Sequence, residues 1–283
     1  MKNLRILRIL WVAPLLFACT SKQEAASKIV VKQFYSALKK NDTTVIYKLY
    51  PNFRKLPSHF KSDTITILSV SSSNEGTWVK IKNGFTNIKN KKFEHDIELL
   101  VSGEPPQMVI SNSRGMYDYK EQELYAFAVS TGCFVPSEIK DDKLASEKLM
   151  EAGDLLIEKS KELIAQLNKE IPLTSLKWNK EFGVGTGNAV LENNSNYGLY
   201  NLRYILTFAD GNGNEVGKND GYVSYDTIVP HSKRKFEILA IQPKDAKNVD
   251  LRIVYDKYFL LDCLKNNNWT GKEYADWKQN RKP

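Results

Sequence analysis

The chain has 283 residues and a formal net charge of +8. This length exceeds one typical hydrophobic core, so two domains are expected. The lysines are spread along the sequence, so the charge excess indicates a solvated surface with some attraction to anionic head groups, and it excludes nucleic acid as the expected partner.

The first eighteen residues have the three parts of an export signal. Lys2, Arg5 and Arg8 are basic, residues 9–17 are apolar, and small residues follow. The apolar stretch is well short of the ~20 residues that span a bilayer, which makes a permanent transmembrane helix the weaker interpretation. We therefore predict a cleaved signal peptide at 1–18, whose removal takes away three basic residues and no acidic ones and leaves a net charge of +5.

The end of this segment, Leu16-Phe17-Ala18-Cys19, resembles the lipobox of bacterial lipoproteins. The resemblance implies that Cys19 carries palmitate-type acyl chains, that residues 19–23 form a lipidated tether, and that the membrane is a partner. Two or three chains hold a protein on a bilayer for long times. Thr20 in place of Asp implies, by the sorting rule of the family, the outer membrane of the cell envelope rather than the inner. The alternative is an ordinary signal peptide with a chance cysteine.

Residues 24–133 are predicted to form the first domain. Apolar residues at helical spacing predict a helix over 24–40, and Asp42 stands where a second short helix needs an N-cap, with Pro51 ending that helix. The period then changes to two, with a turn at 74–76. The predicted strands contain Ile65 and Ile67, then Thr77, Val79 and Ile81, then Phe93, His95, Ile97 and Leu99, and finally residues 108–110. This order predicts an α+β layer with helices on one sheet face.

Two segments of this domain, Phe34–Asp42 and Ile110–Met116, resemble the helix–turn and closing-strand signatures of nuclear-transport-factor-two-like lipoproteins. Met108 stands where that family usually has Trp, and residues 85–92 match loosely. The resemblance implies a cystatin-like α+β cone. Its motifs are packing motifs and imply no activity, although ketosteroid-isomerase-like members of the family hold an Asp base and Tyr or Asp donors in the cone.

His95 is the one candidate pocket residue. Strand alternation places it with Phe93, Ile97 and Leu99 toward the helix-covered face, and it sends the acidic residues 94, 96 and 98 to the opposite face. We expect a buried, neutral core histidine, because no second titratable group shares its strand face. The alternative is that His95 lines a ligand pocket, whose mouth Tyr117 and Tyr119 could reach.

Residues 134–171 are predicted to be a helical connector, helical from Ser137 to Ile171 with a bend near Gly153. Residues 172–262 follow as strands separated by turns, including strands at 222–226 and 249–258, which predict a β-sandwich. The pattern resembles the FxLYD-type immunoglobulin-like domains of bacterial surface proteins at Val190, Asn193, Ser195, Phe208, Asp210, Gly213, Pro230 and Phe236, with His231 in place of the usual Gly. Residues 263–283 are predicted to be a polar C-terminal tail.

The remaining chemistry-bearing residues are few. Cys133 and Cys263 could form a disulfide in an oxidising compartment, or they could be two buried free thiols. The three histidines are far apart in sequence, and no metal-ligand spacing, nucleotide loop or nucleophile motif is present, so no cofactor, metal or catalytic residue is predicted.

The leading hypothesis is a membrane-anchored envelope lipoprotein with a non-enzymatic binding or scaffolding role, whose partner is an envelope protein or a small ligand. The alternative is a small-ligand carrier or ketosteroid-isomerase-like enzyme that uses the cone pocket of the first domain. Titratable side chains around a cavity favour the alternative, and a filled apolar cone opposes it.

Overall fold

The computed structural model describes the backbone of residues 4–181 and 184–280, and the side chains of 22–180 and 184–280 except Pro57. The side chains of the predicted signal peptide 1–18 and of Cys19 lie outside these residues. The chain divides into two compact units. Unit 1 comprises Met1–Ala152 together with Trp269–Pro283, and unit 2 comprises Gly153–Asn268.

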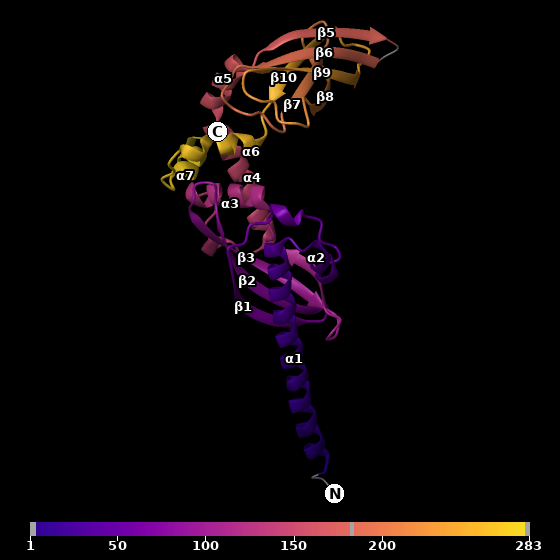
Figure 1. The fold of residues 1–283 in the computed structure, drawn as a ribbon, viewed down its shortest axis with the longest axis vertical. Helices are drawn as coiled ribbons and strands as arrows, with labels where there is room; N and C mark the ends of the chain where they lie inside the picture. Colours follow the sequence, from indigo (N-terminus) through magenta and orange to yellow (C-terminus); the bar gives the residue numbers. More distant parts are fainter. Residues whose placement is uncertain (1–3, 182–183, 281–283) are drawn as a thin grey trace. The chain divides into compact units, whose positions relative to one another are not determined.

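Unit 1 begins with two helices, α1 (Leu4–Lys40) and α2 (Thr43–Leu49) (Figure 1). The predicted apolar face of α1 is confirmed, since Val30, Phe34 and Leu38 are buried. The predicted N-cap of α2 is confirmed as well. The Asp42 carboxylate accepts a hydrogen bond from the backbone N–H of Val45 at 3.1 Å, which satisfies one of the helix's free donors.

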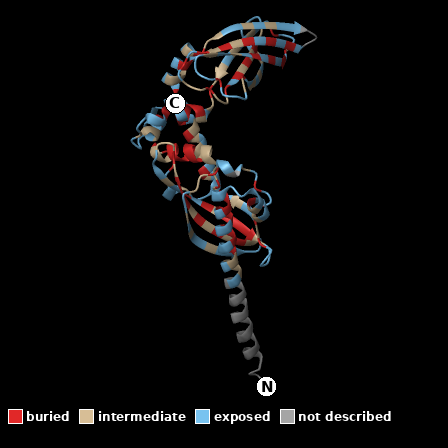
Figure 2. Cartoon of the chain, viewed as in Figure 1, coloured by how far each residue is buried: buried red, intermediate tan, exposed pale blue. Residues whose placement is uncertain are grey.

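A four-stranded antiparallel meander packs against these helices. Its strands are β1 (Thr64–Ser73), β2 (Gly76–Thr86), β3 (Lys92–Ser102) and β4 (Val109–Arg114), in the order β1-β2-β3-β4. Figure 1 shows α1 crossing the sheet, and Figure 2 shows buried and exposed residues alternating along the strands. The side chains under the helices form one apolar core that includes Phe34, Val79, Ile81, Ile97 and Leu99. The predicted α+β order of this unit is confirmed.

The connector contains α3 (Tyr119–Ser130), the short 3-10 turn Pro136–Glu138, α4 (Asp142–Lys159) and α5 (Lys161–Glu170). The prediction of one helix from Ser137 is therefore wrong. The helix begins at Asp142 and is interrupted at Ser160, whose fully buried hydroxyl donates to the carbonyl of Leu156 at 2.7 Å. A serine that bonds its own backbone in this way competes with helical hydrogen bonding. Gly153 stays helical.

The C-terminal residues do not form the predicted polar tail. They contain α7 (Glu273–Asn280), which belongs to unit 1 and buries Trp277. The Glu151 carboxylate of α4 accepts hydrogen bonds from the Tyr274 hydroxyl and the Lys278 ammonium, both at 2.5 Å, and from Lys148 at 2.9 Å. The sequence did not indicate this packing, because Trp277 is the one buried apolar residue of α7 and gives the helix only a weak amphipathic pattern.

Unit 2 consists of two three-stranded antiparallel sheets with the orders β5-β6-β9 and β10-β7-β8. Their inward side chains form one core, to which β7 contributes the alternating residues Tyr204, Leu206 and Phe208, as predicted. The strands are β5 (Leu173–Glu181), β6 (Val184–Asn193), β7 (Arg203–Ala209), β8 (Glu215–Tyr222), β9 (Ser232–Ile241) and β10 (Asn248–Val254). The predicted change from helices to an all-β region is confirmed.

Two predicted strands of unit 2 lie elsewhere. The strand predicted at 222–226 is wrong because β8 ends at Tyr222. The strand predicted at 249–258 stops at Val254, since Asp256 caps a helix, α6 (Lys257–Cys263), by accepting from the backbone N–H of Tyr258 at 2.8 Å. A capping aspartate marks a helix start more strongly than the preceding apolar alternation marks a continuing strand.

Two of the residues predicted to belong to an immunoglobulin-like motif, Asn193 and Ser195, hold loops of unit 2 in place. The fully buried Asn193 amide donates to the carbonyls of Tyr197, Ile228 and Val229 at 2.8–3.2 Å, and its oxygen accepts from the Ser195 hydroxyl at 2.7 Å. His231 has a φ of 56°, a left-handed conformation in which glycine is favoured. These residues therefore have structural roles.

Candidate functional site

A cleft of about 920 Å³ lies in unit 1, along the charged face of the sheet, and it also reaches His95, which alternates with the charged residues of β3. One wall is built by side chains that alternate with the buried core residues of β2, β3 and β4. The other is built by residues 134–145, which run from the end of α3 into α4. The charged side chains of the sheet wall are Lys80, Lys82, Glu94, Asp96, Glu98 and Arg114.

The charged residues of this wall are paired with one another. Diagonal cross-strand pairs join Lys80 to Asp96 at 3.0 Å and Lys82 to Glu94 at 3.8 Å. The hydrogen bond that the Lys80 ammonium donates to Asp96 raises the pKa of Lys80, so this lysine stays charged. The predicted parity is confirmed, because these acids lie on the face opposite the apolar side chains. They line a cleft rather than an open surface.

Arg114 links the two walls of the cleft. Its guanidinium lies 3.4 Å from Glu98 on β3 and 3.6 Å from Asp142 at the start of α4. It also lies over the Trp78 ring, 4.4 Å from the centroid, in cation–π geometry. The three contacts hold the guanidinium in one place, so the start of α4 is tied to the sheet.

His95 is part of the cleft wall and is 5% exposed. Its ring stacks on Tyr117 at 5.2 Å and contacts Tyr125 at 5.5 Å and Phe85 at 5.6 Å. Burial lowers the pKa of His95 to about 4, against the opposing effects of the Asp96 carboxylate and the Gly115 backbone. The imidazole is therefore neutral at pH 7, as predicted. Both ring nitrogens are buried, and apart from a weak contact with the Gly115 backbone neither has a hydrogen-bond partner among the described residues.

Two tyrosines complete the inner end of the cleft. The Tyr125 hydroxyl donates to the backbone carbonyl of Glu94 at 2.8 Å, which holds α3 against β3. Burial raises the pKa of Tyr117 to about 12, and it raises the pKa of Tyr125 as well, so both hydroxyls stay protonated. Tyr119, the other tyrosine predicted at a pocket mouth, is not among the residues that line the cleft, and its ring contacts His59 at 5.4 Å.

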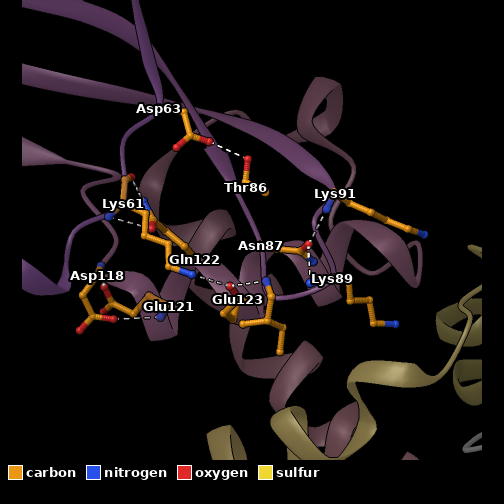
Figure 3. A network of polar contacts seen from close by, with 11 residues as sticks. Lys61, Asp63, Thr86, Asn87, Lys89, Lys91, Asp118, Glu121, Gln122 and Glu123 are labelled. Carbon is orange, nitrogen blue, oxygen red and sulfur yellow. Dashed lines mark hydrogen bonds and ion pairs between the residues drawn. The ribbon is translucent and has the colours of Figure 1, made fainter. Parts of the chain in front are cut away.

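The polar network in Figure 3 fixes α3, which carries Tyr125, to two loops of the sheet. The fully buried Gln122 amide donates to the carbonyl of Lys61 at 2.9 Å and accepts from the Lys61 N–H at 3.3 Å. The buried Glu123 carboxylate accepts from the Lys61 ammonium at 3.3 Å and from the Ile88 N–H at 2.9 Å. Because a buried carboxylate is costly without such partners, this network fixes the position of α3.

The cleft suits binding better than proton transfer. A histidine with a pKa of about 4 is a weak general base near neutral pH. The carboxylates of the sheet wall are occupied by cationic partners. A neutral imidazole whose nitrogens lack strong partners can instead donate one hydrogen bond and accept another.

The other predicted site residues lie away from this cleft. Cys133 and Cys263 are free thiols, the first in unit 1 and the second in unit 2, and their pairing stays a prediction. Burial raises the pKa of Cys133 to about 11 and that of Cys263 to about 12, so both thiols are protonated. Within the described ranges, no cluster of three or more His, Cys, Asp and Glu residues could hold a metal ion.

None of the helices in the described part of the chain combines the length and the apolar character needed to cross a bilayer.

Sequence reasoning missed the far wall of the cleft. Phe134, Ile139 and Asp142 come from a segment that was predicted to be a connector. The polar and apolar residues of that segment show no periodicity that would indicate contact with a sheet. The one further signal was Tyr117, seven residues after the predicted last strand at 108–110. The sequence therefore indicated two lining residues, His95 and Tyr117, but not the cleft.

No protein-family model matches the sequence, and no curated protein matches it either. Among solved structures, the chain is similar to the crystal structure of a DUF1425 family member from Shewanella sp. pv-4. The identity is 9%, the match covers 67% of this chain and 97% of that chain, and the TM-score is 0.22. This degree of similarity assigns no family and no function to the chain.

Proposed function

We propose that the protein is a lipid-anchored lipoprotein of the bacterial cell envelope that binds a small molecule non-catalytically in the cleft of unit 1. The observation that carries the proposal is His95, a buried histidine on the wall of a cleft of about 920 Å³, whose ring nitrogens have at most a weak contact with the Gly115 backbone. Ordinary ligand sites have volumes of roughly 300–1,000 Å³ and a few convergent polar groups. The lipobox ending in Cys19 supports the anchor, and Thr20 favours the outer membrane over the inner.

The finer fold assignments are part of the proposal. A nuclear-transport-factor-two-like cone is supported by helices on one face of a four-stranded meander and by Phe34 of the predicted helix–turn signature, which is fully buried in the core. An FxLYD-type immunoglobulin-like sandwich is supported by the two sheets of unit 2 and by the hydrogen bonds of Asn193. Phe208 and Phe236, both predicted motif residues, are buried between the sheets.

Ligand binding is favoured over the other two hypotheses. A ketosteroid-isomerase-like enzyme needs a base and donors in the cone interior, and the interior under α1 holds apolar core side chains such as Phe34 and Leu99. A purely scaffolding role gives no reason for weakly partnered nitrogens beside a cleft, because an unmade buried hydrogen bond costs about 1–3 kcal/mol. A bound polar group would satisfy them.

The anchor is tested by replacing Cys19. Wild-type protein should incorporate radioactive palmitate in the native organism and partition into detergent phase, and Cys19→Ala should do neither. Cys133→Ala is the matched control, since it removes a cysteine that should carry no lipid. Label that persists on Cys19→Ala would refute the lipoprotein assignment.

The cleft is tested by filling it. Ser137 is exposed and lines the cleft, whereas Ser146 is exposed on α4 outside it. The full-length protein is purified from native membranes in neutral detergent and weighed by native mass spectrometry. Wild type and Ser146→Trp should carry a small molecule that Ser137→Trp lacks, because the indole occupies its space. The same mass increment on all three proteins, or none on any, would contradict the proposal.

A further inference from the structure

A second hollow, of about 780 Å³, lies in unit 1 between α1 and the edge strand β1. It is separate from the cleft, since no residue lines both. On its α1 side stand Lys28, Lys32, Tyr35 and Lys39, at successive spacings of four, three and four residues. Residues at these spacings share one face of a helix, so the three ammonium groups and the tyrosine point toward the same groove.

The three lysines of this groove are exposed and form no ion pair with any described residue. Asp63 is the one carboxylate among the lining residues, and it accepts a hydrogen bond from the Thr86 hydroxyl at 2.7 Å. The groove therefore carries a net positive charge. Hydroxyl donors accompany it on both sides, from Ser36, Ser62, Thr64 and Thr66.

Tyr35 supplies an independent sign of a ligand. Its side chain lines the groove and is 4% exposed, and its hydroxyl is buried without a hydrogen-bond partner in the structure. Burial raises the pKa of Tyr35, so the hydroxyl keeps its proton and can donate. A buried hydroxyl without a partner is unfavourable unless an oxygen from outside the chain accepts from it.

We propose that this groove binds the phosphate of an anionic phosphate ester. Ammonium groups are compact point charges that suit a phosphate, and hydroxyls complete its hydrogen bonds. The half-buried Ile65 and Ile67 of β1 lie beside the charged groups and suit the carbon portion of an ester. The ester is either the head group of an anionic phospholipid or a soluble phosphate ester. The proposal does not depend on the cleft, and it stands if the cleft holds nothing.

The test measures direct binding by calorimetry, with full-length protein in an uncharged detergent. The probes are glycerol 3-phosphate, dihexanoyl phosphatidylglycerol and zwitterionic dihexanoyl phosphatidylcholine. The triple variant Lys28→Gln, Lys32→Gln, Lys39→Gln is compared with Lys169→Gln, Lys177→Gln, Lys244→Gln, which removes the same charge from exposed lysines of unit 2. The groove variant should lose affinity about a hundredfold, roughly fivefold for each lysine, and the control should lose little.

Tyr35→Phe separates a ligand-binding hydroxyl from a structural one. Removal of an unpartnered buried hydroxyl should leave the melting temperature of the ligand-free protein unchanged or raise it, and it should weaken binding of the anionic probe severalfold. Binding of phosphatidylglycerol alone identifies a lipid head group, and binding of glycerol 3-phosphate identifies a soluble ester. The proposal is overturned if neither anionic probe binds, if phosphatidylcholine binds as tightly, or if the two triple variants bind equally.

Discussion

His95→Phe should make the protein less sensitive to acid. The pKa of His95 is about 4 in the folded protein, against an ordinary value of 6.5. Above pH 6.5 the ring is neutral in both states and contributes nothing to the pH dependence. As the pH falls from 6.5 toward 4, the unfolded chain takes up a proton that the folded protein refuses, so stability is lost. Linkage gives a loss of about 2 kcal/mol at pH 5 relative to pH 7.5.

Phenylalanine keeps the stacking on Tyr117 and removes two buried nitrogens that make no hydrogen bond of ordinary geometry. At pH 7.5 the variant should therefore be as stable as wild type or slightly more stable, within ~1 kcal/mol. At pH 5 it should be more stable by about 2 kcal/mol.

The assay is denaturant unfolding of the full-length protein at both pH values. The unfolding transition of unit 1 is followed, and its midpoints and slopes are compared. His59→Phe, which replaces an exposed histidine of the same unit, is the control. If the stability difference between His95→Phe and wild type is the same at both pH values, the buried, neutral state of His95 is refuted.

Four further outcomes are expected. Asn193→Ala should destabilise unit 2 by about 3 kcal/mol in denaturant unfolding, because three carbonyls lose their donor, and a loss below ~1 kcal/mol would contradict this. Burial raises the pKa of Glu151, but hydrogen bonds from cationic neighbours lower it to about 2, so the stabilisation of α7 is present above pH 4.5 and is lost as the pH falls toward 2. After screening of this partly exposed group, Glu151→Gln should cost ~1 kcal/mol at pH 7, seen as faster amide exchange in α7, and an unchanged rate refutes the contact. His231→Gly should stabilise unit 2 by roughly 0.5–1 kcal/mol and so raise its melting temperature, because glycine adopts a φ of 56° without strain. A lower melting temperature would show that His231 is not strained. Mass-tag alkylation of the unreduced, denatured protein should label both Cys133 and Cys263, and the native protein should resist it; failure to label either thiol after denaturation would show that they pair.

Local periodicity determines the parts of the fold that the sequence predicts well. Helix α1 and strands β2 and β3 each bury one face, and the resulting spacing of Val31, Phe34, Val79 and Ile97 is visible in the sequence. The cap at Asp42 follows for the same reason, because its partner lies three residues away. These signals depend only on neighbouring residues.

The parts that could not be predicted depend on partners distant in sequence. The helix is interrupted at Ser160, a buried serine whose hydroxyl donates to the Leu156 carbonyl. Helices tolerate serine, so the sequence gives no sign of an interruption there. Helix α7 is held by contacts to Glu151, more than a hundred residues earlier, and its own sequence is mostly polar. The cleft forms because residues 134–145 lie opposite strands β2 to β4, and no pattern within either segment specifies the other. His95 could be named from strand parity, but the cavity beside it could not.

The return of the chain to unit 1 constrains the order in which the two units fold. Unit 2 is continuous in sequence, whereas unit 1 needs residues from Trp269 onward to cover Glu151. The hydrogen bond between Tyr274 and Glu151 spans 123 positions, and closure of so long a loop is slow when the intervening chain is unfolded. A folded unit 2 shortens that loop by holding its own ends in one compact body. Because the chain is synthesised from its N-terminus, all residues of unit 2 therefore emerge before unit 1 receives its last helix.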